Sequence, residues 1–141
     1  MTTSVSVLGS TGSIGAQTLE IIRERPGDYV VTALGVGRNP DVIAQAEEFR
    51  PQVVAVADAE AAAEIGPQLP EGVDLLVGDA AMADAALTAD TVINGVVGFA
   101  GLPVTLATLK AGKRLGLANK ESLIAAGPVS YTHLTLPTTY H

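Results

Sequence analysis

The chain has 141 residues, 48% of them hydrophobic and 16% charged, so it is long and apolar enough to bury the core of one globular domain. Its formal net charge of -7 argues against an electrostatic surface for nucleic acid or for an anionic membrane. The absence of cysteine excludes a disulfide framework and thiolate zinc sites, and the first basic residue, Arg23, comes too late for a secretory signal, so we expect a cytoplasmic protein.

Apolar runs rich in β-branched residues alternate with alanine-rich segments of helical pattern. Several runs are apolar throughout, as in strands that are covered on both faces of a parallel sheet. The predicted strands are Ser4–Leu8, Tyr29–Val36, Val53–Ala57, Leu75–Val77, Thr91–Asn94 and Arg114–Leu117. The predicted helices follow Gly15, begin at Asn39-Pro40-Asp41, and cover about 58–65, 80–88, 102–111 and 119–126. This alternation predicts right-handed βαβ units, and therefore a Rossmann-like, doubly wound α/β domain with a mostly parallel sheet and helices on both faces.

One uncharged segment, residues 91–109, approaches the length of a membrane span. Three glycines, Asn94 and Pro103 interrupt it. This pattern favours a strand, a loop and a helix of a soluble domain over a membrane helix.

The first predicted strand runs into V-L-G-S-T-G-S-I-G, residues 7–15, where Gly9, Gly12 and Gly15 form G-x-x-G-x-x-G. This spacing differs slightly from the dinucleotide fingerprint G-x-G-x-x-G. A helix N-terminus presents unpaired N–H groups and a partial positive charge, and glycines let phosphate oxygens approach them closely. The loop therefore predicts a dinucleotide site; the alternative is a turn that only lets the first helix pack on the first strand.

The second predicted strand ends at Gly37-Arg38-Asn39, where NAD-specific sites place an acidic residue on the ribose hydroxyl. A carboxylate would repel a 2′-phosphate, whereas a guanidinium group pairs with phosphate through two hydrogen bonds. Arg38 therefore favours NADP(H) over NAD, and the alternative is a solvated surface arginine.

A third motif, L-A-N-K-E-S-L, occupies residues 117–123 after the last predicted strand. Asn119, Glu121 and Ser122 suit the cap and first turn of a helix, so a pure capping role is one interpretation. Lys120 is electrostatically unfavourable in a first turn, and a substrate phosphate or oxyanion could compensate it. The residues alone leave both interpretations open.

Taken together, four motifs resemble those of 1-deoxy-D-xylulose 5-phosphate reductoisomerases. They are G-S-T-G-S-I-G, G-R-N, N-G-V-V-G-F-A-G-L-P-V-T-L and A-G-K-R-L-G-L-A-N-K-E-S-L, in that order, and the resemblance runs from residue 4 to about 128. N-K-E-S-L is the most specific of them. Members of this family make 2-C-methyl-D-erythritol 4-phosphate in the non-mevalonate isoprenoid pathway, using NADPH and a divalent metal (Mg, Mn or Co). The resemblance also implies a sugar-phosphate substrate and a homodimer for the full-length enzyme.

Carried over by position, the resemblance implies three groups of site residues. Thr11, Gly12, Ser13 and Ile14 would line the cofactor pyrophosphate, and Gly37, Arg38 and Asn39 would hold the 2′-phosphate end, where the family often has lysine in place of Arg38. Asn119 and Glu121 would contact the cofactor, and Lys120 the substrate.

The sequence departs from the family after residue 127, because the acidic D-S-E metal-binding motif of the family does not occur. We therefore expect an NADPH-binding domain over residues 1–128, without metal ligands or catalytic residues, that is inactive alone. The segment 129–141 is expected to be non-native or disordered, the alternative being a short extra strand. Two other functions stay open: a domain of another NADP-dependent reductase, such as one like aspartate-semialdehyde dehydrogenase, and a non-catalytic NADP(H)-binding module.

Overall fold

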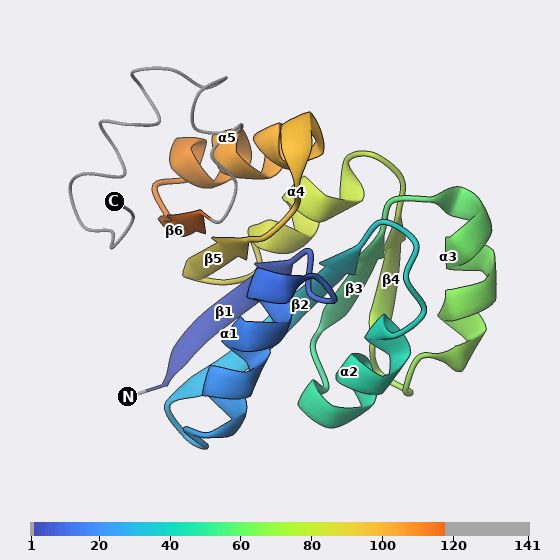
Figure 1. Ribbon diagram of the computed structural model, residues 1–141, viewed down its shortest axis with the longest axis horizontal. Coiled ribbons are helices and arrows are strands. Elements are labelled where there is room, and N and C mark those ends of the chain that lie inside the picture. Colours follow the sequence, from blue (N-terminus) through green and yellow to red (C-terminus); the bar gives the residue numbers. More distant parts are fainter. Residues whose placement is uncertain (1, 118–141) are drawn as a thin grey trace.

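The computed structural model describes residues 2–117, which form one sheet of six parallel strands with helices packed on it (Figure 1). The strand order across the sheet is β4-β3-β2-β1-β5-β6. The strands are β1 (Thr3–Leu8), β2 (Tyr29–Val36), β3 (Val53–Val56), β4 (Asp74–Val77), β5 (Thr91–Asn94) and β6 (Arg114–Leu117). The predicted doubly wound α/β fold is confirmed, and each predicted strand end agrees with the structure to within one residue.

Five α-helices and two short 3-10 turns connect the strands. They are α1 (Ser13–Arg23), α2 (Val42–Phe49), α3 (Ala59–Ile65), η1 (Gly66–Gln68), α4 (Ala81–Ala86), η2 (Gly98–Gly101) and α5 (Leu102–Lys110). Residues 91–109 form β5, η2 and most of α5, as predicted, and no helix within residues 2–117 is long and apolar enough to cross a membrane. The predicted helix at 119–126 and the segment 129–141 lie outside the described residues.

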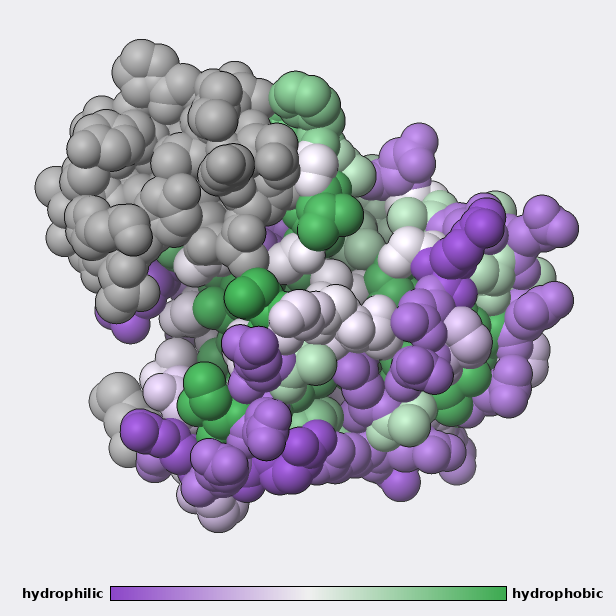
Figure 2. All heavy atoms as spheres, in the orientation of Figure 1, coloured by the Kyte–Doolittle hydropathy of each residue, from purple (hydrophilic) through white to green (hydrophobic). Residues whose placement is uncertain are grey.

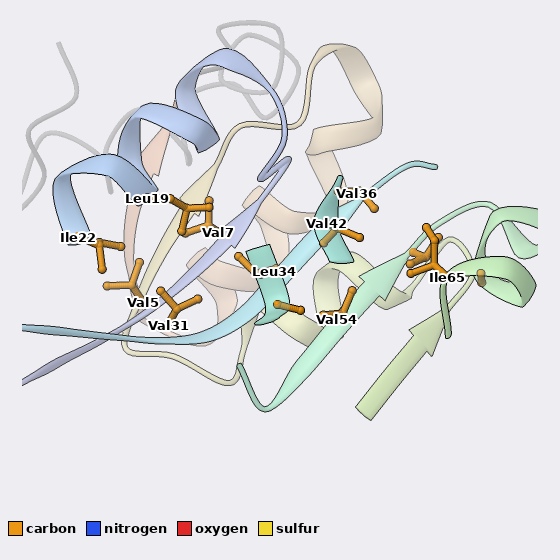
Figure 3. Close-up of a cluster of buried hydrophobic side chains, with 13 residues drawn as sticks. Val5, Val7, Leu19, Ile22, Val31, Leu34, Val36, Val42, Val54 and Ile65 are labelled. Carbon is orange, nitrogen blue, oxygen red and sulfur yellow. The ribbon is translucent and has the colours of Figure 1, made fainter. Parts of the chain in front are cut away.

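Two separate hydrophobic clusters cover the two faces of the sheet. On one face α1, α2 and α3 pack side chains such as Leu19, Val42 and Ile65 against the strands (Figure 3). On the other face α4 and α5 contribute the second cluster, which includes Met82 and Val104. Burying both faces explains why the strand sequences are apolar throughout instead of alternating.

Two helices begin at positions that differ from the predictions. α1 begins at Ser13 instead of after Gly15, because Gly15 lets the first turn lie directly against the loop that precedes it. α2 begins at Val42, three residues after the predicted cap at Asn39. The Asn39 side chain accepts a hydrogen bond from the Asp41 N–H at 2.9 Å, so it closes a turn ahead of the helix instead of capping the helix itself.

The chain reverses its direction of winding at β1. It moves from β1 outward to β4 with its connecting helices on one face, and then returns to place β5 on the other side of β1. Neighbouring loops at the carboxyl ends of β1 and β5 therefore lead to opposite faces of the sheet, and such a switch point is where open α/β sheets bind ligands.

Candidate functional site

Three loops meet at the carboxyl edge of the central strands: residues 9–12 after β1, 37–41 after β2, and 95–101 after β5. The sheet register aligns Leu8, the last residue of β1, with Gly35 on one side and with Asn94 on the other. The sequence-predicted glycine loop and the Arg38 turn therefore follow adjacent strands at the same edge, as the dinucleotide hypothesis requires.

Backbone hydrogen bonds hold the glycine loop in a fixed shape. The N–H groups of Gly9 and Ser10 both donate to the Gly35 carbonyl oxygen, at 2.8 and 2.9 Å, and the Gly12 N–H donates to the Gly9 oxygen at 3.2 Å. From the other side, the Gly95 N–H donates to the Leu8 oxygen at 2.7 Å. Contacts to β2 on one side and to the residue after β5 on the other thus hold the loop in place without a ligand.

The three glycines of the motif serve different purposes. A Cβ on Gly15 would lie 2.2 Å from the Gly9 oxygen, and one on Gly9 would lie 2.6 Å from the Gly95 backbone, so the packing of the fold itself requires both glycines. Gly12 differs, because a Cβ there would meet only the Gly9 oxygen, at an ordinary contact distance of 3.5 Å. Its φ of -76° and ψ of 175° suit any residue. Packing within the fold therefore explains why positions 9 and 15 are glycine. It does not explain why the exposed position 12 is glycine.

The start of α1 presents a set of backbone donors without acceptors. Within residues 2–117, the N–H groups of Thr11, Ser13, Ile14 and Gly15 have no hydrogen-bond partner. The cap residue Gly12 supplies no side-chain acceptor, and the first turn contains no acidic side chain. These donors add to the positive end of the helix dipole, so the site fits an anion such as a phosphate group.

Arg38 lies at the adjacent turn with 78% of its side chain exposed. Its guanidinium group is 3.8 Å from the Asp58 carboxylate, which also caps α3 by accepting the Ala61 N–H at 3.0 Å. The Asp58 N–H donates to the Gly37 oxygen at 2.9 Å and so joins this turn to the end of β3. Arg38 and the neighbouring Asn39 are both open to solvent, and Arg38 is available to a second anionic partner.

Two amide side chains, the buried Asn94 and the partly buried Gln45, support these loops, and the sequence predictions assigned a role to neither. Asn94 donates to the Gly101 oxygen at 2.8 Å and to the Thr105 hydroxyl at 3.0 Å, and it accepts the Val96 N–H at 3.1 Å, which fixes the loop after β5. Gln45, on α2, donates to the Ser10 oxygen at 2.9 Å. A polar Asn94 at the end of an apolar strand is a sequence signal from which its supporting role could have been predicted. The contact of Gln45 joins residues 35 positions apart, and no local sequence pattern indicates it.

Three large apolar side chains are exposed at or near this edge: Ile14 in α1, and Val97 and Phe99 after β5. Their exposed fractions are 42%, 82% and 71%. Elsewhere on the face in Figure 2, hydrophilic residues dominate the lower part, and pale residues of intermediate hydropathy cross the middle, where Figure 1 places the start of α1. Exposed apolar side chains near an anion site suit a ligand that combines rings with phosphates.

Other parts of the predicted site are not placed by the structure. Asn119, Lys120 and Glu121 lie outside residues 2–117. Within that range no group of three or more histidine, aspartate or glutamate side chains is placed to hold a metal ion. A groove of about 280 Å³ lies at the opposite edge of the sheet, where Thr3, Thr91 and Arg114 begin their strands, so it is separate from these loops.

The sequence matches the family model of 1-deoxy-D-xylulose 5-phosphate reductoisomerase over residues 5–127. A reductoisomerase of this name from Synechococcus sp. (strain CC9605) is 49% identical over 136 residues, which cover 89% of this chain and 33% of the relative. The reductoisomerase of Acaryochloris marina is 43% identical over 136 residues, with the same coverage of both chains. The chain thus spans about a third of the length of the curated relatives that it matches.

Solved structures agree with the sequence comparison. The Zymomonas mobilis reductoisomerase in complex with NADPH superposes with a TM-score of 0.87 at 35% identity, covering 96% of this chain and 36% of that one. A reductoisomerase in complex with NADPH, fosmidomycin and magnesium gives a TM-score of 0.86 at 37% identity, covering 94% of this chain and 34% of that one. The match over nearly the whole chain, in sequence and in fold, shows that the chain belongs to the 1-deoxy-D-xylulose 5-phosphate reductoisomerase family.

Proposed function

We propose that this chain is the NADPH-binding portion of a 1-deoxy-D-xylulose 5-phosphate reductoisomerase. The observation that carries the proposal is the bare start of α1, where Gly12 lacks a side chain that the fold would tolerate and the following N–H groups lack acceptors. NADPH would supply the hydride that reduces the rearranged aldehyde to 2-C-methyl-D-erythritol 4-phosphate.

The pyrophosphate of the cofactor would bind at the glycine loop. Thr11, Ser13 and Ile14 bring unpaired backbone donors to the positive end of α1, and Gly12 adds no side chain in front of them. The hydroxyls of Thr11 and Ser13 could add to these donors because neither side chain is buried. A bulky side chain at Gly12 would stand between the helix and the phosphate oxygens.

The 2′-phosphate would bind at the turn formed by Gly37, Arg38 and Asn39. The exposed Arg38 guanidinium can turn from Asp58, at 3.8 Å, toward a phosphate that carries more charge. The turn presents no carboxylate of its own to hold an unphosphorylated ribose, so the arrangement favours NADPH over NADH.

The remaining assignments rest on the family alone. Asn119 and Glu121 would contact the cofactor, Lys120 would contact the sugar-phosphate substrate, and the divalent metal and the second subunit would belong to the full-length enzyme. We also propose that the 141-residue chain cannot turn over 1-deoxy-D-xylulose 5-phosphate alone. Metal-dependent NADPH oxidation by the purified chain in the presence of this substrate would contradict that proposal.

The decisive experiment compares the dissociation constants of NADPH and NADH for the wild-type chain and for Arg38→Ala. We expect NADPH to bind more tightly to the wild type, and Arg38→Ala to narrow the difference by about tenfold, since a charged hydrogen bond contributes about 1.5–3 kcal/mol and this site is open to solvent. Arg25→Ala is the matched control, because Arg25 is another exposed arginine, located beyond the end of α1. Equal affinities of the wild type for the two cofactors would refute the assignment of Arg38.

A further inference from the structure

One side chain connects α2 to the glycine loop. Gln45 lies in the second turn of α2, and its Nε2 donates to the Ser10 carbonyl oxygen at 2.9 Å. Ser10 is fully buried, and Gln45 is partly buried. α2 itself follows the Arg38 turn, so this hydrogen bond links the glycine loop to the helix that leads away from that turn.

The hydrogen bond fixes the orientation of one particular peptide group. The peptide unit between Ser10 and Thr11 is planar and trans, so its C=O and its N–H point in opposite directions. By holding the Ser10 oxygen, Gln45 therefore also sets the direction of the Thr11 N–H. That N–H is one of the donors without an acceptor.

The neighbouring peptide groups have other supports. The Ser10 N–H is held by the Gly35 oxygen, and the Gly12 N–H is held by the Gly9 oxygen. Within the described residues, the Ser10–Thr11 peptide has the Gln45 amide as its sole hydrogen-bond partner. Of the peptide groups in the loop, the Ser10–Thr11 peptide is consequently the one whose orientation depends most on the Gln45 side chain.

A contribution to the stability of the fold does not by itself explain why residue 45 is glutamine. The Gln45 Oε1 and the Ser10 hydroxyl are both buried without a hydrogen-bond partner in the described part of the chain. Buried unpaired polar atoms are unfavourable, and natural proteins retain few of them. An apolar side chain would remove one of these atoms, but it would also release the Ser10–Thr11 peptide.

We infer that Gln45 is a positioning residue that aims the Thr11 N–H at the cofactor pyrophosphate. The inference rests on the proposed NADPH site and adds a residue to it that does not itself touch the cofactor. It also implies that a change at Gln45 acts on pyrophosphate binding and spares recognition of the 2′-phosphate.

The test uses Gln45→Met in the full chain, with calorimetric affinities for NADPH and for adenosine 2′-monophosphate, which lacks a pyrophosphate. We expect NADPH to bind about tenfold more weakly, which corresponds to about 1.4 kcal/mol, while the affinity for the monophosphate changes less than about twofold. Gln68→Met is the matched control, because Gln68 makes a similar side-chain bond to the Glu64 oxygen, at 3.1 Å, away from the site. An NMR titration adds a second readout: NADPH should shift the Thr11 amide resonance strongly in the wild type and weakly in Gln45→Met.

Three results would overturn the inference. One is an unchanged NADPH affinity in Gln45→Met, and another is an equal loss for both ligands, which would indicate general damage to α2. A wild type that binds neither ligand would refute the proposed NADPH site itself, and the inference with it. If Gln45→Met does not fold, Gln45→Glu keeps the shape of the side chain, removes the amide donor, and is subject to the same outcomes.

Discussion

Alanine substitutions at Gly12 and Gly15 should separate cofactor binding from folding. The two glycines are three positions apart at the start of one helix, and each substitution adds one methyl group. Because the fold packs tightly against Gly15 and leaves Gly12 open, the same chemical change should produce opposite phenotypes.

Gly15→Ala should destabilise the domain. The added Cβ would lie 2.2 Å from the Gly9 oxygen and 2.7 Å from the Ser10 Cα, and both are backbone atoms that cannot rotate away. An alanine in an exposed helix would gain about 1 kcal/mol over glycine, but overpacking a buried site costs about 1–3 kcal/mol and sometimes more. The clash with backbone places this site at the upper end, so we expect a net loss of about 2 kcal/mol or more in the free energy of unfolding.

Gly12→Ala should keep the fold and lose the cofactor. Its Cβ would lie at a normal 3.5 Å from the Gly9 oxygen, and the backbone dihedral angles suit alanine, so the stability loss should stay near the 1 kcal/mol typical of a poorer helix cap. The methyl group would hold the phosphate away from the N–H donors. Losing one charged hydrogen bond, about 1.5–3 kcal/mol, predicts at least a tenfold weaker affinity for NADPH.

Urea unfolding followed by circular dichroism measures the first quantity, and calorimetric titration with NADPH measures the second. Two other glycines are unsuitable as control positions. Alanine at Gly27 would be strained because Gly27 has a positive φ of 90°. Gly37 has open space for a Cβ, but it lies in the proposed site. The two variants therefore serve as controls for each other. A Gly12→Ala chain that binds NADPH as the wild type does, or a Gly15→Ala chain of wild-type stability, would refute the division of roles.

Three further predictions concern the scaffold around the site. Asp58→Ala should lower the free energy of unfolding by about 1 kcal/mol in urea, because α3 loses its side-chain cap on the Ala61 N–H, and Asp58→Asn should restore most of it; equal losses in both would argue against capping. The hydrogen bond from Arg23 holds the pKa of Glu48 below its ordinary value, so the pair should stabilise the fold at neutral pH and lose this effect as the pH falls through that lowered pKa. Urea titrations of the wild type and Glu48→Gln should therefore converge on acidification, and a constant difference would contradict the assignment. Leu34→Ala should cost about 2–5 kcal/mol because Leu34 is fully buried in the cluster shared by α1 and α2, and a smaller loss by urea unfolding would mean that the cavity collapses.

Local sequence signals were sufficient to predict the strands and to place the glycine loop and the Arg38 turn at strand ends. The strands were predictable because continuous apolar runs end at glycine, proline or charged residues, and the glycine loop because it joins such a run to a helix. The position of Arg38 at the sheet edge was predictable because it lies two residues after the end of a buried strand.

Contacts between distant residues were beyond these signals. The place of β5 beside β1 follows from which surfaces pack together, and alternating strands and helices allow more than one strand order. Gly15 belongs to α1 because of its fit against the Gly9 carbonyl group, a contact across a folded loop. Gln45 is an unremarkable helix residue in the sequence, and only the packing of α2 against the first loop brings it to the Ser10 oxygen.

The clamp between the β1 loop and the β5 loop has a consequence for the order in which the site forms during synthesis. Gly9 takes its shape beside Gly95, and the Ser4 hydroxyl accepts a hydrogen bond from the Asp90 N–H, 86 positions later in the chain. When only β1, α1 and β2 have left the ribosome, the nascent chain contains the glycine motif. It still lacks the Gly95 backbone, against which Gly9 packs in the folded domain. The glycine loop, although it lies within the first fifteen residues, should therefore take its final shape only when β5 has emerged and paired, late in the folding of the domain.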